Sequence, residues 1–333
     1  MPAVSVITPA WNAEGFIGET IESVLAQTFA DWEMVIVDDG STDGTASVVE
    51  AYAARDARIR LLQQQNAGPS AARNHAMRQA RGDFFAFLDS DDRWTPDFLR
   101  AQMEVFGRYP ETGLVTTTGI FDGGPFDGQP MRAVTPGCPI LTLTEIISDE
   151  TAVFIMTVFR RTVFGTIGGF DETQWTSEDY DFWLRAAIAG FVFRRNPQPL
   201  GMYRVRGNSL SRNRIRMIDG LLQSFAKARA RCDDQPDVRA AIDRQVARFE
   251  SERLLEEAKD ALEQRHFSRA AARLRALRAR GGGRMIAVTA WLAEHIPPAA
   301  ALAYRARAWR PRFRRGGGAP ARGRRGPTAQ EAA

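Results

Sequence analysis

Short apolar runs alternate with helical patterns along the first part of the chain. Runs rich in β-branched and aromatic residues predict strands at residues 4–8, 33–37, 59–62 and 84–88. Between them, apolar positions recur at the helical period and predict helices at residues 13–27, 45–55 and 70–80. The last run is apolar throughout, which is typical of a strand covered on both faces. This order predicts an α/β fold, with a mostly parallel, Rossmann-like sheet flanked by helices.

The pattern changes toward the C-terminus. After Ser211 the chain is rich in Ala and Arg at helical spacing, and residues 254–280 predict a helical hairpin. A triple glycine at 281–283 predicts a linker, and the final residues are low-complexity Arg, Gly and Pro sequence. We therefore expect an α/β domain over 1–211, an α-helical appendage over 212–280, an amphipathic basic segment over 281–309 and a disordered tail over 310–333.

Composition and charge narrow the class of protein. The chain has 333 residues, 25% of them charged and 44% hydrophobic, which excludes collagen-like and wholly disordered proteins. Residues 1–210 hold 27 acidic and 17 basic residues, whereas residues 211–333 hold 13 acidic and 27 basic residues. The net charge of +4 therefore conceals an acidic part and a basic part with different surroundings.

Cysteine usage and hydropathy indicate a compartment. Cys138 and Cys232 match no metal-binding or redox spacing, and the N-terminus resembles a strand rather than a signal peptide. No stretch reaches the roughly 18 uninterrupted apolar residues of a membrane span. The sequence predicts a cytoplasmic protein, at most peripheral at the inner face of the cell membrane.

Acidic residues are concentrated where the predicted strands end. Asp38 and Asp39 follow the second strand, and Asp89, Asp91 and Asp92 follow the fourth. Ligands of doubly wound sheets bind beyond these carboxyl ends. Close carboxylates repel each other unless a cation neutralises them, and Mn²⁺ or Mg²⁺ completed by substrate phosphates fits such oxygens. The alternative is that these acids cap the next helix. No GxGxxG follows the first strand and no GxxxxGK[ST] occurs, which disfavours NAD-type and P-loop chemistry.

Four segments in this order resemble the family 2 glycosyltransferases. They are SVITPAWN at 5–12, VDDGSTDGT at 37–45, NAGPSAARN at 66–74 and DSDD at 89–92. The resemblance covers about residues 3–211 and implies the GT-A fold and an inverting, hexosyltransferase-type enzyme that uses a nucleotide-sugar.

The resemblance assigns the donor-binding residues. Pro9 and Trp11 match the loop beside the nucleotide base, Asp39 matches the acid that accepts from the base N–H, and Arg73 matches an arginine beside the nucleotide. Trp11 could instead be a core aromatic, and Arg73 could instead form a salt bridge with the acidic loop.

The same resemblance covers the DxD-type motif and the base. Asp89 matches the acid nearer the ribose and sugar, and Asp91 matches the metal ligand. Asp179, the second acid of an Glu178-Asp179 pair, matches the general base, with Glu178 in support. The alternative for this pair is favourable negative charge in the first turn of a helix.

One position departs from the family pattern. Relatives often carry His where this chain has Arg206, and a guanidinium does not ligate a metal. We hypothesise that Arg206 holds the donor diphosphate by charge-assisted hydrogen bonds. The QxxRW signature of processive synthases is not seen, which favours transfer of one sugar per acceptor.

The C-terminal part suggests a partner. Nine arginines occur between Glu294 and Glu331 without an acid, after an amphipathic stretch that contains Trp291. Such a pair of features favours peripheral contact with an anionic membrane, although a solvated basic tail fits equally; nucleic acid is the less favoured partner.

Together these features predict metal-assisted, inverting transfer from a nucleotide-diphosphate-sugar, most simply a UDP-sugar, to a carbohydrate or lipid-linked acceptor in cell-envelope or surface polysaccharide synthesis. The alternative is a non-catalytic nucleotide-sugar-binding scaffold that acts through its basic helical C-terminus.

Overall fold

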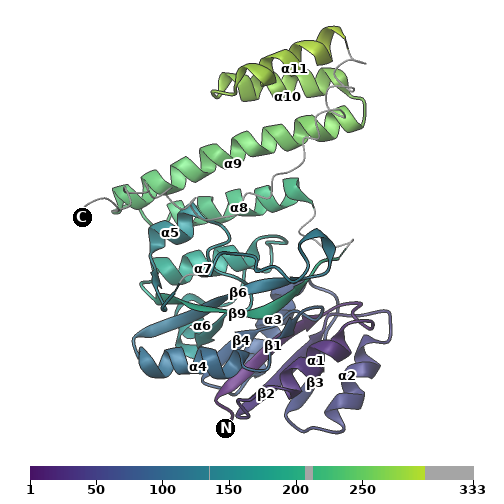
Figure 1. Ribbon diagram of the computed structural model, residues 1–333, viewed down its shortest axis with the longest axis vertical. Coiled ribbons are helices and arrows are strands. Elements are labelled where there is room, and N and C mark those ends of the chain that lie inside the picture. Colours follow the sequence, from purple (N-terminus) through teal and green to yellow (C-terminus); the bar gives the residue numbers. More distant parts are fainter. Residues whose placement is uncertain (135, 207–212, 297–333) are drawn as a thin grey trace, which may run out of the picture.

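The computed structural model describes residues 1–134, 136–206 and 213–296. A nine-stranded sheet in the order β3-β2-β1-β4-β8-β6-β9-β5, with β7 beside β9, forms its centre (Figure 1). The strands are β1 (Val4–Ala10), β2 (Trp32–Asp38), β3 (Ile59–Gln63), β4 (Phe84–Phe87), β5 (Arg93–Trp94), β6 (Thr112–Asp122), β7 (Ile140–Leu141), β8 (Val158–Arg160) and β9 (Val192–Arg204).

Helices cover the sheet and extend beyond it. They are α1 (Ile17–Leu25), α2 (Thr45–Ala53), α3 (Pro69–Gln79), α4 (Phe98–Arg108), α5 (Leu143–Ser148), α6 (Arg161–Ile167), α7 (Glu178–Ile188), α8 (Arg214–Arg229), α9 (Pro236–Glu263), α10 (Phe267–Ala279) and α11 (Arg284–His295), with a 3₁₀ turn at Gly124–Phe126.

The predicted α/β fold is confirmed. The four N-terminal strands are all parallel, since β1 pairs with β2 and β4, and β2 pairs with β3. Beyond β4 the sheet is mixed, because β8 is antiparallel to both β4 and β6, and β9 runs parallel to β6. Two reversals restore the original direction, so β9 ends at the same edge as β1 to β4. Residues after β4 and after β9 can therefore meet at one site.

Each central strand buries both faces, which explains the continuous apolar runs. Ile7, Val35 and Phe87 pack into the cluster that includes α3 and α7. Val6 and Met34 pack into a second cluster on the opposite face, with α1 and α4. Alternating side chains along one strand thus supply two cores.

The helical C-terminal region is continuous with the sheet domain at its start. Phe225 of α8 and Phe249 of α9 are fully buried in the cluster that also holds Phe87. The boundary predicted at 212 coincides with no break in this core, and the four-part division stays a prediction. The predicted hairpin over 254–280 is present as the second half of α9 and α10.

The last two described helices form a separate layer. With 28 residues, α9 is about 42 Å long, and α10 and α11 pack together on its far side from α8 (Figure 1). Small clusters around Ala261 and Ala258 hold them. Within the described ranges no helix is both long and apolar enough to cross a membrane. The tail predicted at 310–333, and residues 297–309 of the basic segment, lie outside the described residues.

Candidate active site

The loop after β1 is held by the loop after β2. The backbone N–H of Asn12 donates to Ser41 Oγ at 2.9 Å, and Asn12 Oδ1 accepts from the Thr42 N–H at 2.8 Å. These bonds fix the backbone beside Trp11, whose side chain is 57% exposed. This exposure excludes the core-aromatic alternative. Pro9 is buried within β1.

Asp39 organises the loop that leads into α3. Its Oδ1 accepts from Gln64 Nε2 at 2.8 Å and from the Ala67 N–H at 2.9 Å, and its Oδ2 accepts from the Gly68 N–H at 2.8 Å. Asp39 is only 3% exposed. Because a carboxylate has about four acceptor positions, Asp39 keeps room for about one further donor.

The acidic loop after β4 is tied to the end of β9. Asp92 is 2% exposed, and its Oδ1 accepts from the Arg204 N–H at 2.9 Å. Arg204 Nε also donates to the Asp91 carbonyl at 3.0 Å. Burial raises the pKa of Asp92 well above its usual range, and the charges of Asp91 and Asp89 raise it further. The loop therefore concentrates negative charge that a cation would stabilise.

Arg206 lies just after the end of β9, and its side chain contacts the acidic loop. Its Nη1 donates to Asp91 Oδ2 at 2.7 Å, and its guanidinium lies 4.4 Å from the ring centroid of Phe16. Both side chains of the ion pair remain about one quarter exposed. The structure thus brings Arg206 and Asp91 together, 115 residues apart in sequence.

Arg73 joins the two halves of the site. From α3 its Nη2 donates to Asp89 Oδ1 and its Nη1 to Glu178 Oε1, both at 2.7 Å. Its side chain is 4% exposed. Burial opposes its charge, but the charges of Asp89 and Glu178 outweigh this and hold the pKa of the guanidinium above its ordinary value. Arg73 makes the ion pair with the acidic loop that the sequence left open; its contact with a nucleotide stays a prediction.

Asp179 lies in the first turn of α7, beside this bridge. Burial raises the pKa of Asp179 to about 7, and the charge of Glu178 also raises it, while Arg73 and the Tyr180 N–H oppose the shift. Asp181 points elsewhere, since it pairs with Arg185 at 2.8 Å inside the protein. Asp179 thus combines partial exposure with a pKa near neutrality.

Trp175 lies at this site although sequence reasoning assigns no role to it. Its side chain is 62% exposed, yet its neighbours are anchored: Gln174 Nε2 donates to Ser224 Oγ at 2.8 Å, and Thr176 Oγ1 donates to the Arg216 carbonyl at 2.7 Å. The ring would lie 3.3 Å from a Cβ at Gly68. In the sequence, the only sign that Trp175 lies at the site is that it comes three residues before Glu178.

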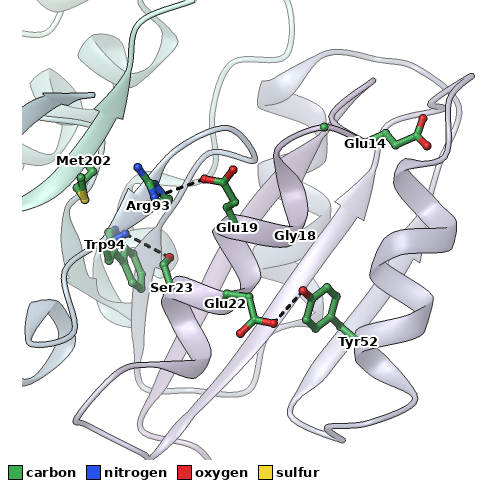
Figure 2. A pocket seen from close by; sticks show the side chains of 10 residues that line it. Glu14, Gly18, Glu19, Glu22, Ser23, Tyr52, Arg93, Trp94 and Met202 are labelled. Atoms are coloured by element: carbon green, nitrogen blue, oxygen red, sulfur yellow. Dashed lines mark hydrogen bonds and ion pairs between the residues drawn. The ribbon is translucent and has the colours of Figure 1, made fainter. Parts of the chain in front are cut away.

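A hollow of about 550 Å³ lies on another side of α1, between α1, α2, β5 and β9 (Figure 2). Its wall includes Glu14, Glu19 and Glu22, with Glu19 paired to Arg93 at 3.4 Å. None of the predicted site residues lines it. Because three carboxylates would repel a diphosphate, this hollow is a poor fit for the phosphates of the predicted donor.

The residues after β4 can bind a divalent cation only if other oxygens complete its coordination. Among the described residues, no three His, Cys, Asp or Glu side chains are grouped to hold a metal. Asp91 offers one hard carboxylate, so a cation there needs further oxygens from a diphosphate, as Mg²⁺ and Mn²⁺ commonly take. The donor set therefore fits a metal that arrives with a nucleotide rather than a preformed metal cage.

Comparison with known proteins identifies the class. The model for Glycosyl transferase family 2 matches residues 5–168. The putative teichuronic acid biosynthesis glycosyltransferase TuaG of Bacillus subtilis is 35% identical over 214 residues, which are 64% of this chain and 83% of that protein. The chain belongs to glycosyltransferase family 2 and is a transferase.

Other similar proteins agree with this class. WfgD of Escherichia coli, named a UDP-Glc:alpha-D-GlcNAc-diphosphoundecaprenol beta-1,3-glucosyltransferase, is 31% identical over 64% of this chain and 81% of its own. Residues 1–349 of Staphylococcus aureus TarS, solved with UDP-GlcNAc, superpose with a TM-score of 0.64 at 21% identity, over 92% of each chain. The mannosyltransferase PcManGT of Pyrobaculum calidifontis, solved with GDP-Man and Mn²⁺, gives 0.62 at 23% identity, over 92% of this chain and 88% of that one. These structures share the GT-A fold predicted for this chain.

Proposed function

We propose that the chain transfers a sugar from a UDP-sugar to a hydroxyl of a carbohydrate or lipid-linked acceptor, with inversion, in envelope or surface polysaccharide synthesis. One observation carries the proposal. Asp179, with a pKa raised to about 7, stands beside a buried bridge from Glu178 through Arg73 to Asp89. A carboxylate of that pKa suits proton removal near neutral pH. The names of TuaG and WfgD and the UDP-GlcNAc held by TarS support the substrate class.

In the proposed reaction Asp179 takes the proton of the acceptor hydroxyl. The acceptor oxygen forms its bond to the anomeric carbon as the bond from that carbon to the diphosphate breaks, and the nucleoside diphosphate leaves with the electron pair. Because attack and departure occur on opposite faces, the anomeric configuration inverts. The Asp179 carboxylate is kept near the anionic loop by the Arg73 bridge, whose positive charge limits repulsion.

The donor would be bound by residues around the strand ends. Exposed Trp11 offers an aromatic face for the base, and Pro9 supports that loop from within β1. Asp39 has about one acceptor position for the base N–H. Arg206 would bind the diphosphate by charge-assisted hydrogen bonds. A divalent cation, Mn²⁺ or Mg²⁺, would when bound supply positive charge for the leaving diphosphate, with Asp91 as its protein ligand.

The test is a panel of UDP- and GDP-sugars with Mn²⁺ or Mg²⁺, read as donor hydrolysis and as transfer, alongside UDP affinity by calorimetry. We expect Asp179→Asn to lower turnover by about 100-fold or more while it keeps UDP affinity. Asp91→Ala should lower metal-dependent UDP affinity. Glu104→Gln is the control, because Glu104 on α4 is 63% exposed and pairs with Arg100 on the same helix. Turnover that survives both active-site changes would refute the mechanism, and UDP binding without any turnover would favour the scaffold.

A further inference from the structure

Helix α11 has two apolar faces, and only one of them packs against other residues that the structure describes. Thr289, Ala290 and Ala293 are buried against α10. Val288, Trp291 and Ile296 are 49%, 52% and 44% exposed. At 100° per residue Val288 and Trp291 lie about 60° apart, on the face of α11 opposite Ala290 and Ala293. Ile296 directly follows the last residue of the helix. We call this exposed set the α11 stripe.

The α11 stripe is unusual within the described part of the chain. Exposed apolar residues normally occur singly, and several on one helix face mark a surface that meets another phase or molecule. Trp291 stacks on His295, with ring centroids 4.9 Å apart, so its ring is held against the helix rather than folded into the core. A tryptophan with an apolar body and one N–H donor suits a boundary between water and an apolar phase.

The charges around the α11 stripe select what can dock there. Residues 266–296 contain six arginines and one acid. Three of these arginines are paired: Arg275 with Glu294 at 2.6 Å, and Arg273 and Arg280 with Glu257 and Glu250 of α9 at 2.7 and 2.6 Å. Residues 297–330 add nine arginines and no acid. The sequence that follows the stripe is therefore strongly basic, and an anionic surface is attracted by such charge over about a Debye length.

We propose that the α11 stripe docks on an anionic lipid surface. Val288, Trp291 and Ile296 would enter the boundary between headgroups and acyl chains, while the surrounding arginines contact lipid phosphates. Helix α11 lies on the side of α9 away from the sheet (Figure 1), so docking through this helix leaves the strand-end site uncovered. This proposal concerns attachment to a membrane and stands independently of the reaction.

A matched pair of variants tests it. Val288 on α11 and Val134 on the sheet domain are 49% and 51% exposed. Val288→Asp and Val134→Asp therefore introduce the same charge at equally exposed positions, one within the stripe and one away from it. The full chain is sedimented with vesicles of phosphatidylglycerol and phosphatidylcholine, and with vesicles of phosphatidylcholine alone. Oligomeric state by light scattering and hydrolysis of a UDP-sugar are measured in parallel.

We expect the wild type and Val134→Asp to sediment with the anionic vesicles and to be released by salt. Val288→Asp and Trp291→Ala should each bind them roughly tenfold more weakly, with UDP-sugar hydrolysis unchanged. Equal losses for Val288→Asp and Val134→Asp would reduce the effect to charge alone and overturn the proposal. No binding by the wild type, unchanged binding by Val288→Asp, or conversion of a dimer to a monomer by Val288→Asp would overturn it too; the last would show that a second copy covers the stripe.

Discussion

Arg73 donates to Glu178 at 2.7 Å from a position that is almost entirely buried, so α3 is fixed to the first turn of α7. The other end of the same guanidinium holds Asp89 at 2.7 Å. One side chain thereby sets the spacing between the acidic loop and the segment that carries Asp179. Because it stays charged, it also limits the repulsion among these carboxylates.

Removing this bridge should destabilise the protein. Arg73→Met leaves Asp89 and Glu178 without their shared cation, and breaking a buried ion pair from one side costs about 3 kcal/mol or more. Arg78→Ala, on the same helix, removes a 57% exposed arginine with a 4.0 Å ion pair and should change stability by less than about 0.5 kcal/mol. Urea unfolding of the two variants measures the difference, and equal stabilities would show that the bridge contributes nothing.

The rise of activity with pH, on the acidic side of the pH–rate profile (its acid limb), should follow the ionisation of Asp179. With a pKa of about 7, about one tenth of the molecules carry the ionised base at pH 6 and about nine tenths at pH 8. The rate constant kcat/KM for the UDP-sugar should therefore rise across this range. A profile that is level from pH 5 to pH 8 would exclude Asp179 as the titrating base.

A neighbouring substitution should move that limb. Glu178→Gln removes a negative charge that raises the pKa of Asp179, and it leaves more of the Arg73 charge to act on Asp179. Both effects favour the carboxylate, so the limb should shift to lower pH. Glu104→Gln, which alters an exposed carboxylate on α4 outside this network, should leave the pH dependence unchanged. A shift to higher pH in Glu178→Gln would contradict the assignment.

The same ionisation should oppose folding. The folded-state pKa of Asp179 lies above its unfolded value of 3.8, so the charged form destabilises the fold increasingly as pH rises from 4 to 7. Asp179→Asn should therefore raise the melting temperature at pH 8 and have little effect at pH 4. Asp171→Asn should instead lower the melting temperature at both pH values. The hydrogen bond from Lys227 lowers the pKa of Asp171 to about 2, so the stabilisation by its ionised form is nearly complete at pH 4 and is lost only as the pH falls toward 2. Thermal melts at the two pH values check both signs.

The sheet was predictable because its strands are doubly buried. An apolar run as short as 84–88 is more simply a strand covered on both faces than a buried helix. The acidic turns that follow such runs show which edge of the sheet holds the strand ends. The later strands were not predictable at this level. β8 (Val158–Arg160) and the two-residue β5 and β7 carry too few residues to show a period, and the longer β6 and β9 pair with shifts in register that interrupt theirs.

The candidate site was predictable residue by residue but not as a set of contacts. Carboxylates at strand ends are visible in sequence, whereas the pairing of Arg206 with Asp91 depends on β9 returning to the same edge through two reversals. Likewise, Trp175 is indistinguishable from a core tryptophan until the hydrogen bonds of Gln174 and Thr176 show that its backbone is fixed while its ring stays exposed.

Arg206 should influence both metal and nucleotide. It pairs with Asp91 at 2.7 Å, so Arg206→Ala should increase the affinity for Mn²⁺ in the absence of nucleotide, as measured by electron paramagnetic resonance. The same variant should bind UDP about tenfold more weakly, because a charge-assisted hydrogen bond contributes about 1.5 kcal/mol or more. Arg100→Ala, at an exposed pair on α4, is the control. Unchanged UDP affinity and rate would refute a role for Arg206 at the diphosphate.

Gly68 should not tolerate a side chain, for two separable reasons. Its backbone has φ +90°, where alanine is strained by about 1–3 kcal/mol, and a Cβ would lie 3.3 Å from the ring of Trp175. Gly137→Ala isolates the strain, since Gly137 has φ +78° with no atom near a Cβ. Gly68→Ala should therefore lower both the melting temperature and the UDP affinity, because the Gly68 N–H holds Asp39, whereas Gly137→Ala should lower only the former. If the contact with Trp175 matters, adding Trp175→Ala to Gly68→Ala should restore part of the stability. If the losses of stability from Gly68→Ala and Trp175→Ala are additive in the double variant, the whole cost of Gly68→Ala lies in the strained backbone.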